Sequence, residues 1–241
     1  MKSFRLDAVA AALAVVEREC PTCLAAFLAG SVVRGEATAS SDLDIMVIVP
    51  EGSPTYRESF RAFDWPVEVF VHTSSEHRQF VAKDAARRRP STSMMDCEGI
   101  ILRDVDGFAS QLKLEACALL EQGPPPLAAA ELALARYGVS DLMDDLADAR
   151  ADEAFLIAAQ LAEASANLIL DCHRRWRGSG KWTPRMLRRL DPALATRLAE
   201  ALSAFYIAGD NTSLMDFAAH ALTLAGGRLW EGFRLSAEDG T

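Results

Sequence analysis

The first half of the chain mixes two hydrophobic periods. Residues 4–19 place apolar side chains at three- and four-residue spacing, as a helix that covers a sheet does. Helical segments are also predicted over 75–89 and 107–121, the second with Asp106 as its N-cap. Short apolar runs of strand length lie between these segments; they are 23–29, the run that ends at Val49, 66–71 and 99–104. This pattern predicts an α/β domain.

The second half shows helical spacing throughout. Alanine and leucine dominate it, and apolar residues recur at three and four positions over 128–149, 152–177, 192–207 and 213 to about 230. Gly123 and the three prolines that follow it cannot continue a helix and form a stiff spacer. We therefore predict an α/β domain over residues 1–123 and an all-α helical bundle over residues 127–241.

Two carboxylates stand at the head of the second apolar run. Asp42 and Asp44 are two residues apart, so in a strand both point to one face while Leu43 points to the other. Carboxylates this close repel unless a cation lies between them, and Mg²⁺ takes such oxygen ligands together with substrate phosphates. Glu68 stands alone among the apolar residues 66–71, where burial without a partner is costly. We expect it to join the two aspartates rather than to face solvent at a sheet edge.

Gly30 and Ser31 follow the first apolar run, where we expect the strand to turn into the start of a helix. Glycine lets the backbone approach a phosphate, and a helix N-terminus offers free N–H groups at its positive end. Ser31 adds a hydroxyl donor. Together with the acidic residues, these features outline a site for phosphoryl transfer.

The order of these residues resembles that of the nucleotidyltransferase superfamily, which includes DNA polymerase β: Gly30-Ser31, then Asp42-Leu43-Asp44, then a separate strand with Glu68. The stretch between them, with Arg34-Gly35-Glu36-Ala37-Thr38 and Ser40-Ser41, is similar to that of aminoglycoside adenylyltransferases and minimal nucleotidyltransferase antitoxins. The resemblance covers roughly residues 24–72. It implies a small mixed sheet with flanking helices, followed by a bundle that supplies the acceptor pocket.

The resemblance also implies roles for individual residues. Asp42 and Asp44 would be ligands of two Mg²⁺ ions, with Glu68 as a third acid that completes the metal site or accepts the acceptor's proton. The donor, ATP or another NTP, would lose pyrophosphate when a hydroxyl attacks its α-phosphorus. The residues implied to contact its phosphates are Gly30, Ser31, Arg34 and Ser41. For Arg34 the alternative is a solvated loop residue.

Two features of the second half are candidate substrate contacts. Asp141, Asp144, Asp145 and Asp148 repeat at helical spacing, and we weigh a solvated acidic face against a pocket in which Asp144 and Asp145 hold a cationic acceptor. The loop 178–185 loosely resembles the one from which aminoglycoside adenylyltransferases extend a lysine. This resemblance implies Lys181 as a triphosphate contact.

Composition narrows the partners and the compartment. The 241 residues carry a net charge of −9, which weighs against a long nucleic-acid substrate. We find no segment of membrane-spanning length and no signal peptide, so we expect a cytoplasmic protein without a membrane partner. The five cysteines, an odd number, predict reduced thiols rather than a disulfide framework. Cys20 and Cys23 form a C-x-x-C, which we interpret as a packed pair rather than a redox or zinc motif.

Three functions follow from these residues and the resemblance. The first is a metal-dependent enzyme that moves a nucleoside monophosphate, AMP from ATP in the simplest case, onto a hydroxyl of a small molecule, with aminoglycoside-like compounds among the candidates. The second is a protein nucleotidyltransferase of the antitoxin type, and the third a non-catalytic nucleotide-binding scaffold. We favour the first, because the antitoxins resemble only the first domain and all three acids are present. The acceptor, the NTP and the choice between monomer and homodimer stay open.

Overall fold

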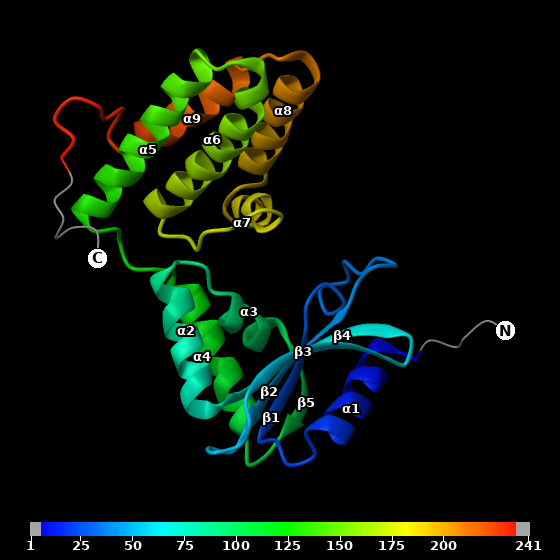
Figure 1. Cartoon of the computed structure of the whole chain (residues 1–241). Helices are drawn as coiled ribbons and strands as arrows, with labels where there is room; N and C mark the ends of the chain where they lie inside the picture. The colour runs from blue at the N-terminus through cyan, green and yellow to red at the C-terminus, as the bar shows by residue number, and fades with distance from the viewer. Residues whose placement is uncertain (1–5, 235–241) are drawn as a thin grey trace. The chain divides into compact units, whose positions relative to one another are not determined.

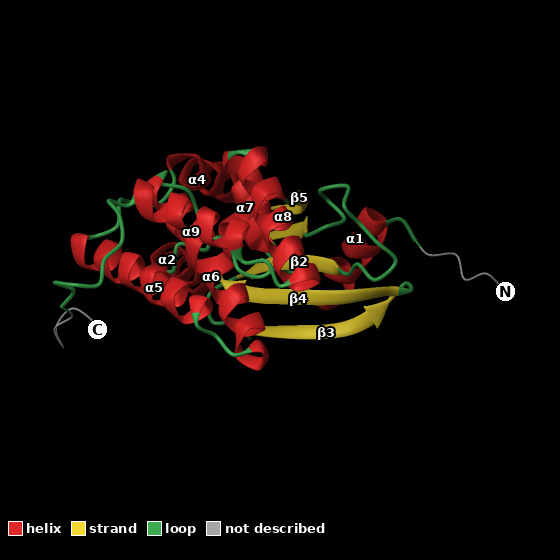
Figure 2. Cartoon of the chain, turned by 90° about the horizontal axis from the view of Figure 1, so that it is seen from above, coloured by secondary structure: helices red, strands yellow, loops and turns green. Residues whose placement is uncertain are grey.

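The structure, a computed structural model, describes residues 6–234 of the chain. These residues divide into two compact units, and the division falls between Gln122 and Gly123 (Figure 1). The predicted fold class is confirmed: a mixed five-stranded sheet with helices is followed by a helical region. Figure 2 shows that the described strands all belong to the first unit.

The sheet of the first unit has the strand order β3-β4-β2-β1-β5. Its strands are β1 (Ala25–Ala29), β2 (Leu43–Val49), β3 (Tyr56–Ala62), β4 (Trp65–Thr73) and β5 (Ile100–Asp104). Strands β2 and β4 pair in parallel, while β1–β2, β1–β5 and β3–β4 pair antiparallel. The sheet is therefore mixed, and β3 and β5 form its edges.

Helices cover both faces of this sheet (Figure 1). They are α1 (Ala8–Glu19), α2 (Ser74–Ala86), α3 (Ser91–Glu98) and α4 (Phe108–Gln122). Leu43 and Ile45 of β2 pack with α1, whereas Met46 and Ile48 pack toward α3 and α4. Because side chains alternate along a strand, Asp44 shares the face of Met46 and Ile48, at the beginning of the strand.

Strand β3 was not among the predicted strands. Its sequence, YRESFRA, is largely polar and exposed because it lies at the edge of the sheet, where one side of the strand faces solvent. It joins β4 through Phe63 and Asp64, whose φ values of 51° and 62° suit a two-residue hairpin loop with both central residues left-handed. Asn-Gly is the usual sequence for such a loop, so Phe-Asp gives no turn signal.

In the first unit, the predicted end of α2 and the predicted cap of α4 were wrong. Helix α2 ends at Ala86 rather than at residue 89, because Arg88 takes a φ of 58° and its side chain is buried before α3 begins. The cap of α4 is Asp104 and not Asp106: Asp104 accepts a hydrogen bond from the Ala109 N–H at 2.8 Å.

The second unit is a bundle around one long helix. Its helices are α5 (Ala129–Ala147), α6 (Ala151–Cys172), α7 (Trp182–Leu190), α8 (Pro192–Ala208) and α9 (Thr212–Leu224). Helix α6 packs against the other four and buries Leu161, Leu168 and Ile169 completely or almost so. It ends at Cys172, earlier than predicted. There the buried Asp171 accepts hydrogen bonds from Arg177 of the following loop at both carboxylate oxygens, at 3.0 Å from Nε to Oδ1 and at 2.6 Å from Nη2 to Oδ2.

Helix α6 differs from expectation in another respect. By length and composition alone, its 22 residues would suffice to cross a membrane, whereas no segment of the sequence was expected to do so. Half of its most apolar window is buried by the surrounding helices of the unit. A core helix of a bundle has these same properties, so the length of α6 carries no conclusion about a membrane.

The expectation of five reduced cysteines was also wrong. Cys97 of α3 and Cys117 of α4 form a disulfide, with a Cα–Cα distance of 4.9 Å, and the other three cysteines have free thiols. Neither the spacing of Cys97 and Cys117 nor a motif around them pointed to this pair, because the packing of α3 on α4 creates the proximity. Cys20 and Cys23 are buried, and burial raises the pKa of the Cys23 thiol to about 11, so the C-x-x-C packs as a neutral pair.

The disulfide predicts a thiol count. Protein purified without reductant and then denatured will react with a thiol reagent at three cysteines per chain, and at all five after reduction. Replacing Cys172 by serine will lower both counts by one, whereas replacing Cys97 by serine will raise the unreduced count to four, because Cys117 is then released. Five reactive thiols before reduction would contradict the Cys97–Cys117 bond.

Candidate active site

Three carboxylates converge on one face of the sheet. Asp42 directly precedes β2, Asp44 is the second residue of that strand, and Glu68 lies opposite Asp44 in the parallel β2–β4 register. One carboxylate oxygen from each residue lies within 4.8 Å of those of the other two, and all three side chains are partly exposed. The structure therefore brings together the acids that the sequence singled out.

This donor set fits a divalent cation. Carboxylate oxygens are hard ligands, and two of them on opposite sides of one Mg²⁺ are about 4 Å apart, close to the separation of the oxygens in this cluster. Without a cation, three negative charges at this distance repel one another. The cluster is thus a candidate metal centre, reached from solvent because none of its members is fully buried.

The absence of a side chain at Gly30 leaves room for the Asp44 carboxylate. Gly30 follows β1, whose last residue Ala29 pairs with Asp44, and it has a φ of 85°, in the left-handed region that favours glycine. A Cβ atom at Gly30 would collide with the Asp44 carboxylate. The helix expected after Gly30 is not there: residues 31–35 form turns, and the Glu36 N–H donates to the Ser31 carbonyl at 2.9 Å. No helix dipole supports this loop.

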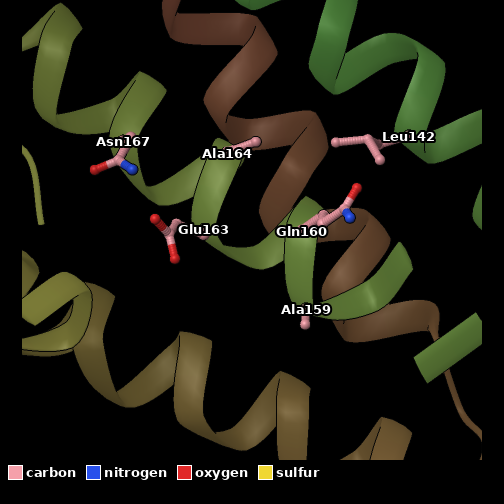
Figure 3. A pocket seen from close by; sticks show the side chains of 6 residues that line it. All are labelled: Leu142, Ala159, Gln160, Glu163, Ala164 and Asn167. Carbon is pink, nitrogen blue, oxygen red and sulfur yellow. The ribbon is translucent and has the colours of Figure 1, made fainter. Parts of the chain in front are cut away.

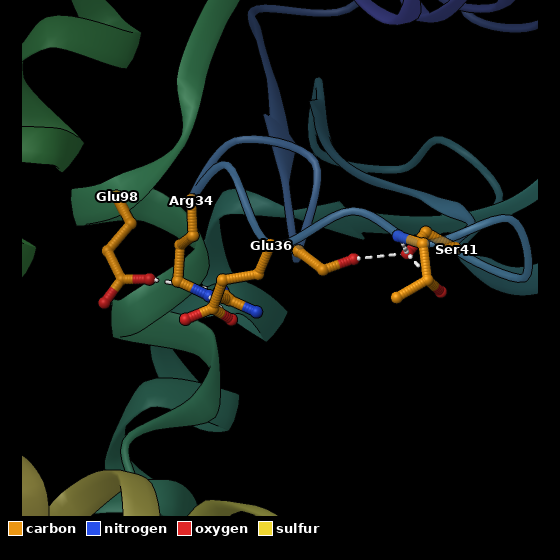
Figure 4. Close-up of polar contacts among 6 residues, drawn as sticks. Arg34, Glu36, Ser41 and Glu98 are labelled. Carbon is orange, nitrogen blue, oxygen red and sulfur yellow. Dashed lines mark hydrogen bonds and ion pairs between the residues drawn. The ribbon is translucent and has the colours of Figure 1, made fainter.

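Ser31 and Ser41 are hydrogen-bonded to each other across the loop that leads from Gly30 to Asp42, and Figure 4 shows Ser41 with its contacts. The Ser31 hydroxyl donates to Ser41 Oγ at 3.0 Å, and Ser41 Oγ also accepts the Thr38 N–H at 2.9 Å. Ser41 is buried beside Asp42. These bonds join the two ends of the loop next to the carboxylates.

Arg34 is not a solvated loop residue. Its guanidinium donates to Glu36 and to Glu98 of α3, both at 3.3 Å, and its side chain is only 18% exposed (Figure 4). Arg34 thus connects the loop to α3. Its contact with a phosphate stays a prediction.

Sequence reasoning missed two residues that contact Glu68. Arg57 and Ser59 of β3 both donate hydrogen bonds to Glu68 Oε1. The signal was the alternation of Arg57, Ser59 and Arg61 with Phe60 and Ala62 of the same strand, which puts polar side chains on the face of Glu68 and apolar ones on the other. It was hidden because the strand itself was not predicted.

Asp144 and Asp145 are exposed on α5. Asp144 already pairs with a cation of its own unit, since Arg228 donates to its carboxylate at 2.6 Å and to the Ser140 carbonyl at 3.2 Å. The open hollow in this part of the bundle lies between α5 and α6 instead, with a volume of about 490 Å³ (Figure 3). It is lined by Leu142, Ala159, Gln160, Glu163, Ala164 and Asn167. We call it the α5–α6 groove.

The loop before α7 is fastened to the wall of this groove. The Gly178 N–H donates to Asn167 Oδ1 at 3.2 Å, and the Gly180 N–H donates to Glu163 Oε2 at 3.3 Å. Lys181 comes next in the chain and is exposed. Its contact with a triphosphate stays a prediction, as does acceptor binding by Asp144 and Asp145.

A Gly-Ser turn beside three carboxylates on adjacent strands of a mixed sheet defines a site of the nucleotidyl-transfer class. Residues 16–89 match the model of the nucleotidyltransferase domain family, so the first unit contains a nucleotidyltransferase domain. The resemblance to the nucleotidyltransferase superfamily is thereby confirmed.

Among solved structures, the chain is similar to a nucleotidyltransferase-like protein from Exiguobacterium sibiricum, at 11% sequence identity and a TM-score of 0.46, over 91% of this chain and 77% of that chain. No curated protein matches the chain.

The collision at Gly30 predicts a site-specific effect. Gly30→Ala will displace the Asp44 carboxylate and weaken Mn²⁺ binding by about tenfold or more, measured by titration with the metal alone. Gly52→Ala is the matched control, because Gly52 has a φ of 83° and no atom near its would-be Cβ. Both variants carry the left-handed strain of about 1–2 kcal/mol, but only the first alters the site. Equal Mn²⁺ affinities in the two variants would contradict this account.

Proposed function

We propose that the chain is a metal-dependent nucleotidyltransferase that transfers a nucleoside monophosphate, AMP from ATP in the simplest case, to a hydroxyl of a small molecule. The observation that carries the proposal is the convergence of Asp42, Asp44 and Glu68 within a nucleotidyltransferase domain. Three carboxylates in contact with solvent suit the binding of a cation together with a triphosphate. The net charge of −9 favours a small acceptor over a nucleic-acid polymer.

Asp42, Asp44 and Glu68 would hold Mg²⁺, which when bound neutralises charge on the triphosphate and lowers the pKa of an attacking hydroxyl. Gly30 keeps the position of Asp44 clear of any side chain. The Ser31–Ser41 hydrogen bond holds the loop beside the acids in one conformation, and this loop would contact the donor's phosphates. Arg34 fixes the same loop to α3 through Glu98.

Acceptor recognition belongs to the second unit in this proposal. The volume of the α5–α6 groove falls in the range of small-molecule sites, about 300–1,000 Å³. Its wall combines the Glu163 carboxylate with the amides of Gln160 and Asn167, which suits a ligand that carries hydroxyl or amino groups. Glu163 and Asn167 also accept hydrogen bonds from the loop that leads to Lys181. A ligand that contacts these two side chains in the groove would therefore affect the position of that loop.

The metal centre gives the first test. Asp42→Asn and Asp44→Asn each remove a charged ligand without changing side-chain volume, so each will lower pyrophosphate release by about a thousandfold or more while the unfolding temperature stays close to that of the wild type. The assay supplies Mg²⁺ with ATP or GTP and a panel of amino sugars and other polyols.

Asp64→Asn is the control for this substitution. Asp64 is exposed in the β3–β4 loop with a positive φ that asparagine also adopts, so turnover will not change. Full turnover in Asp42→Asn or Asp44→Asn would refute the proposed function. Metal-dependent nucleotide binding without pyrophosphate release for any acceptor of the panel would favour a protein as the acceptor.

The groove gives a second test. Glu163→Gln removes the negative charge that would pair with a cationic acceptor in the groove. It will raise the KM of such an acceptor by about tenfold or more, while the KM of the NTP changes little. Asp145→Asn removes one exposed charge from α5, outside the residues that line the groove, and serves as the control. If Asp145→Asn raised the acceptor KM and Glu163→Gln did not, the acidic face of α5 would be the pocket.

A further inference from the structure

Two side chains of the edge strand β3, which lie outside the acidic cluster, donate hydrogen bonds to Glu68; we call this contact the grip on Glu68. The Arg57 guanidinium donates to Glu68 Oε1 through Nε at 2.8 Å, and its Nη2 lies 2.6 Å from the same oxygen. The Ser59 hydroxyl donates to this oxygen as well, at 3.2 Å. We infer that Arg57 and Ser59 are positioning residues that orient Glu68 as a ligand of the metal centre.

The distribution of these bonds decides which oxygen of Glu68 faces the cation. All three donor atoms approach Oε1, and no hydrogen bond among the residues that the structure describes reaches Oε2. With Oε1 occupied by three donors, the carboxylate cannot rotate without breaking a charge-assisted pair. Oε2 is thereby left for a metal ion.

The backbone register builds this grip into the sheet. Ser59 lies directly opposite Glu68, and Arg57 lies opposite Phe70, on the same face of β3 as Ser59. The Arg57 guanidinium also stacks over the Phe70 ring at 4.9 Å from its centroid. Although the Arg57 side chain is 64% exposed, it is therefore restrained at two points.

An arginine beside a cation site could instead compete with the metal. Here the ion pair and the convergence of the acids exist together, because Glu68 contacts Arg57 while one of its oxygens lies within 4.8 Å of those of Asp42 and Asp44. The grip therefore does not hold Glu68 away from the cluster. An outer partner of this kind orients a metal ligand, and its loss commonly lowers metal affinity by about 10–100-fold.

This inference rests on the proposed function, and the test separates the two. Mn²⁺ alone is titrated into the full chain, and free Mn²⁺ is followed by electron paramagnetic resonance. Arg57→Gln will raise the Mn²⁺ dissociation constant by about tenfold or more, and Ser59→Ala by a smaller factor. Arg57→Lys keeps the charge but loses the two-nitrogen contact with Oε1, so it will restore only part of the affinity.

Arg18→Gln is the matched control. Arg18 is an exposed arginine of the same unit that also pairs with a glutamate, Glu19, and lies over a phenylalanine ring, that of Phe60. It belongs to α1, which covers the other face of the sheet. Its replacement will leave Mn²⁺ affinity unchanged, and thermal unfolding of each variant shows that the fold persists.

Each outcome has one meaning. Mn²⁺ binding that depends on Asp44 and weakens in Arg57→Gln but not in Arg18→Gln supports the inference. Unchanged or tighter binding in Arg57→Gln, with dependence on Asp44 intact, overturns the positioning role and leaves the proposed function standing. Binding that is absent in the wild type, or equal in Asp44→Asn, overturns the metal centre and both proposals with it.

Discussion

The site depends on the parallel pairing of β2 with β4, which forces like charges together. Asp44 and Glu68 face each other because Leu43, Ile45 and the buried valines of β4 fix the register from the opposite face of the sheet. A slip of one residue would turn Glu68 into the apolar core, at a cost that excludes it. Hydrophobic burial on one face therefore keeps the carboxylates together on the other face in spite of their electrostatic repulsion, which a bound cation would relieve.

The local part of this arrangement could be predicted from the sequence. Asp44 and Glu68 stand in apolar strands and Asp42 directly precedes the first of them, so the period of two predicts that Asp42 and Asp44 point to the same face. The turn at Gly30 was predicted as well, but the turns of residues 31–35 that follow it were not, because a helix was expected there. A glycine marks where the chain changes direction, whereas the hydrogen bonds of residues 31–41 decide between a helix and a loop.

Contacts between distant segments could not be predicted. Arg57 and Ser59 lie in a polar edge strand that has no hydrophobic signature, and the Arg34–Glu98 pair spans 64 positions. The Cys97–Cys117 bond joins two helices whose packing no spacing rule encodes. In each case the sequence holds the residue type, but the partner is chosen by the tertiary fold.

The contacts of the short helix α3 connect α4 to the loop beside the carboxylates. This helix has eight residues, too few for an isolated helix to persist in water, yet its last two residues carry the disulfide to α4 and the ion pair to Arg34. The disulfide to α4 and the ion pair with Arg34 restrain α3 between α4 and the loop beside the carboxylates. Displacing Glu98 from Arg34 therefore requires moving either α4 or the loop itself, so this end of the site resists deformation although its loop has no regular secondary structure.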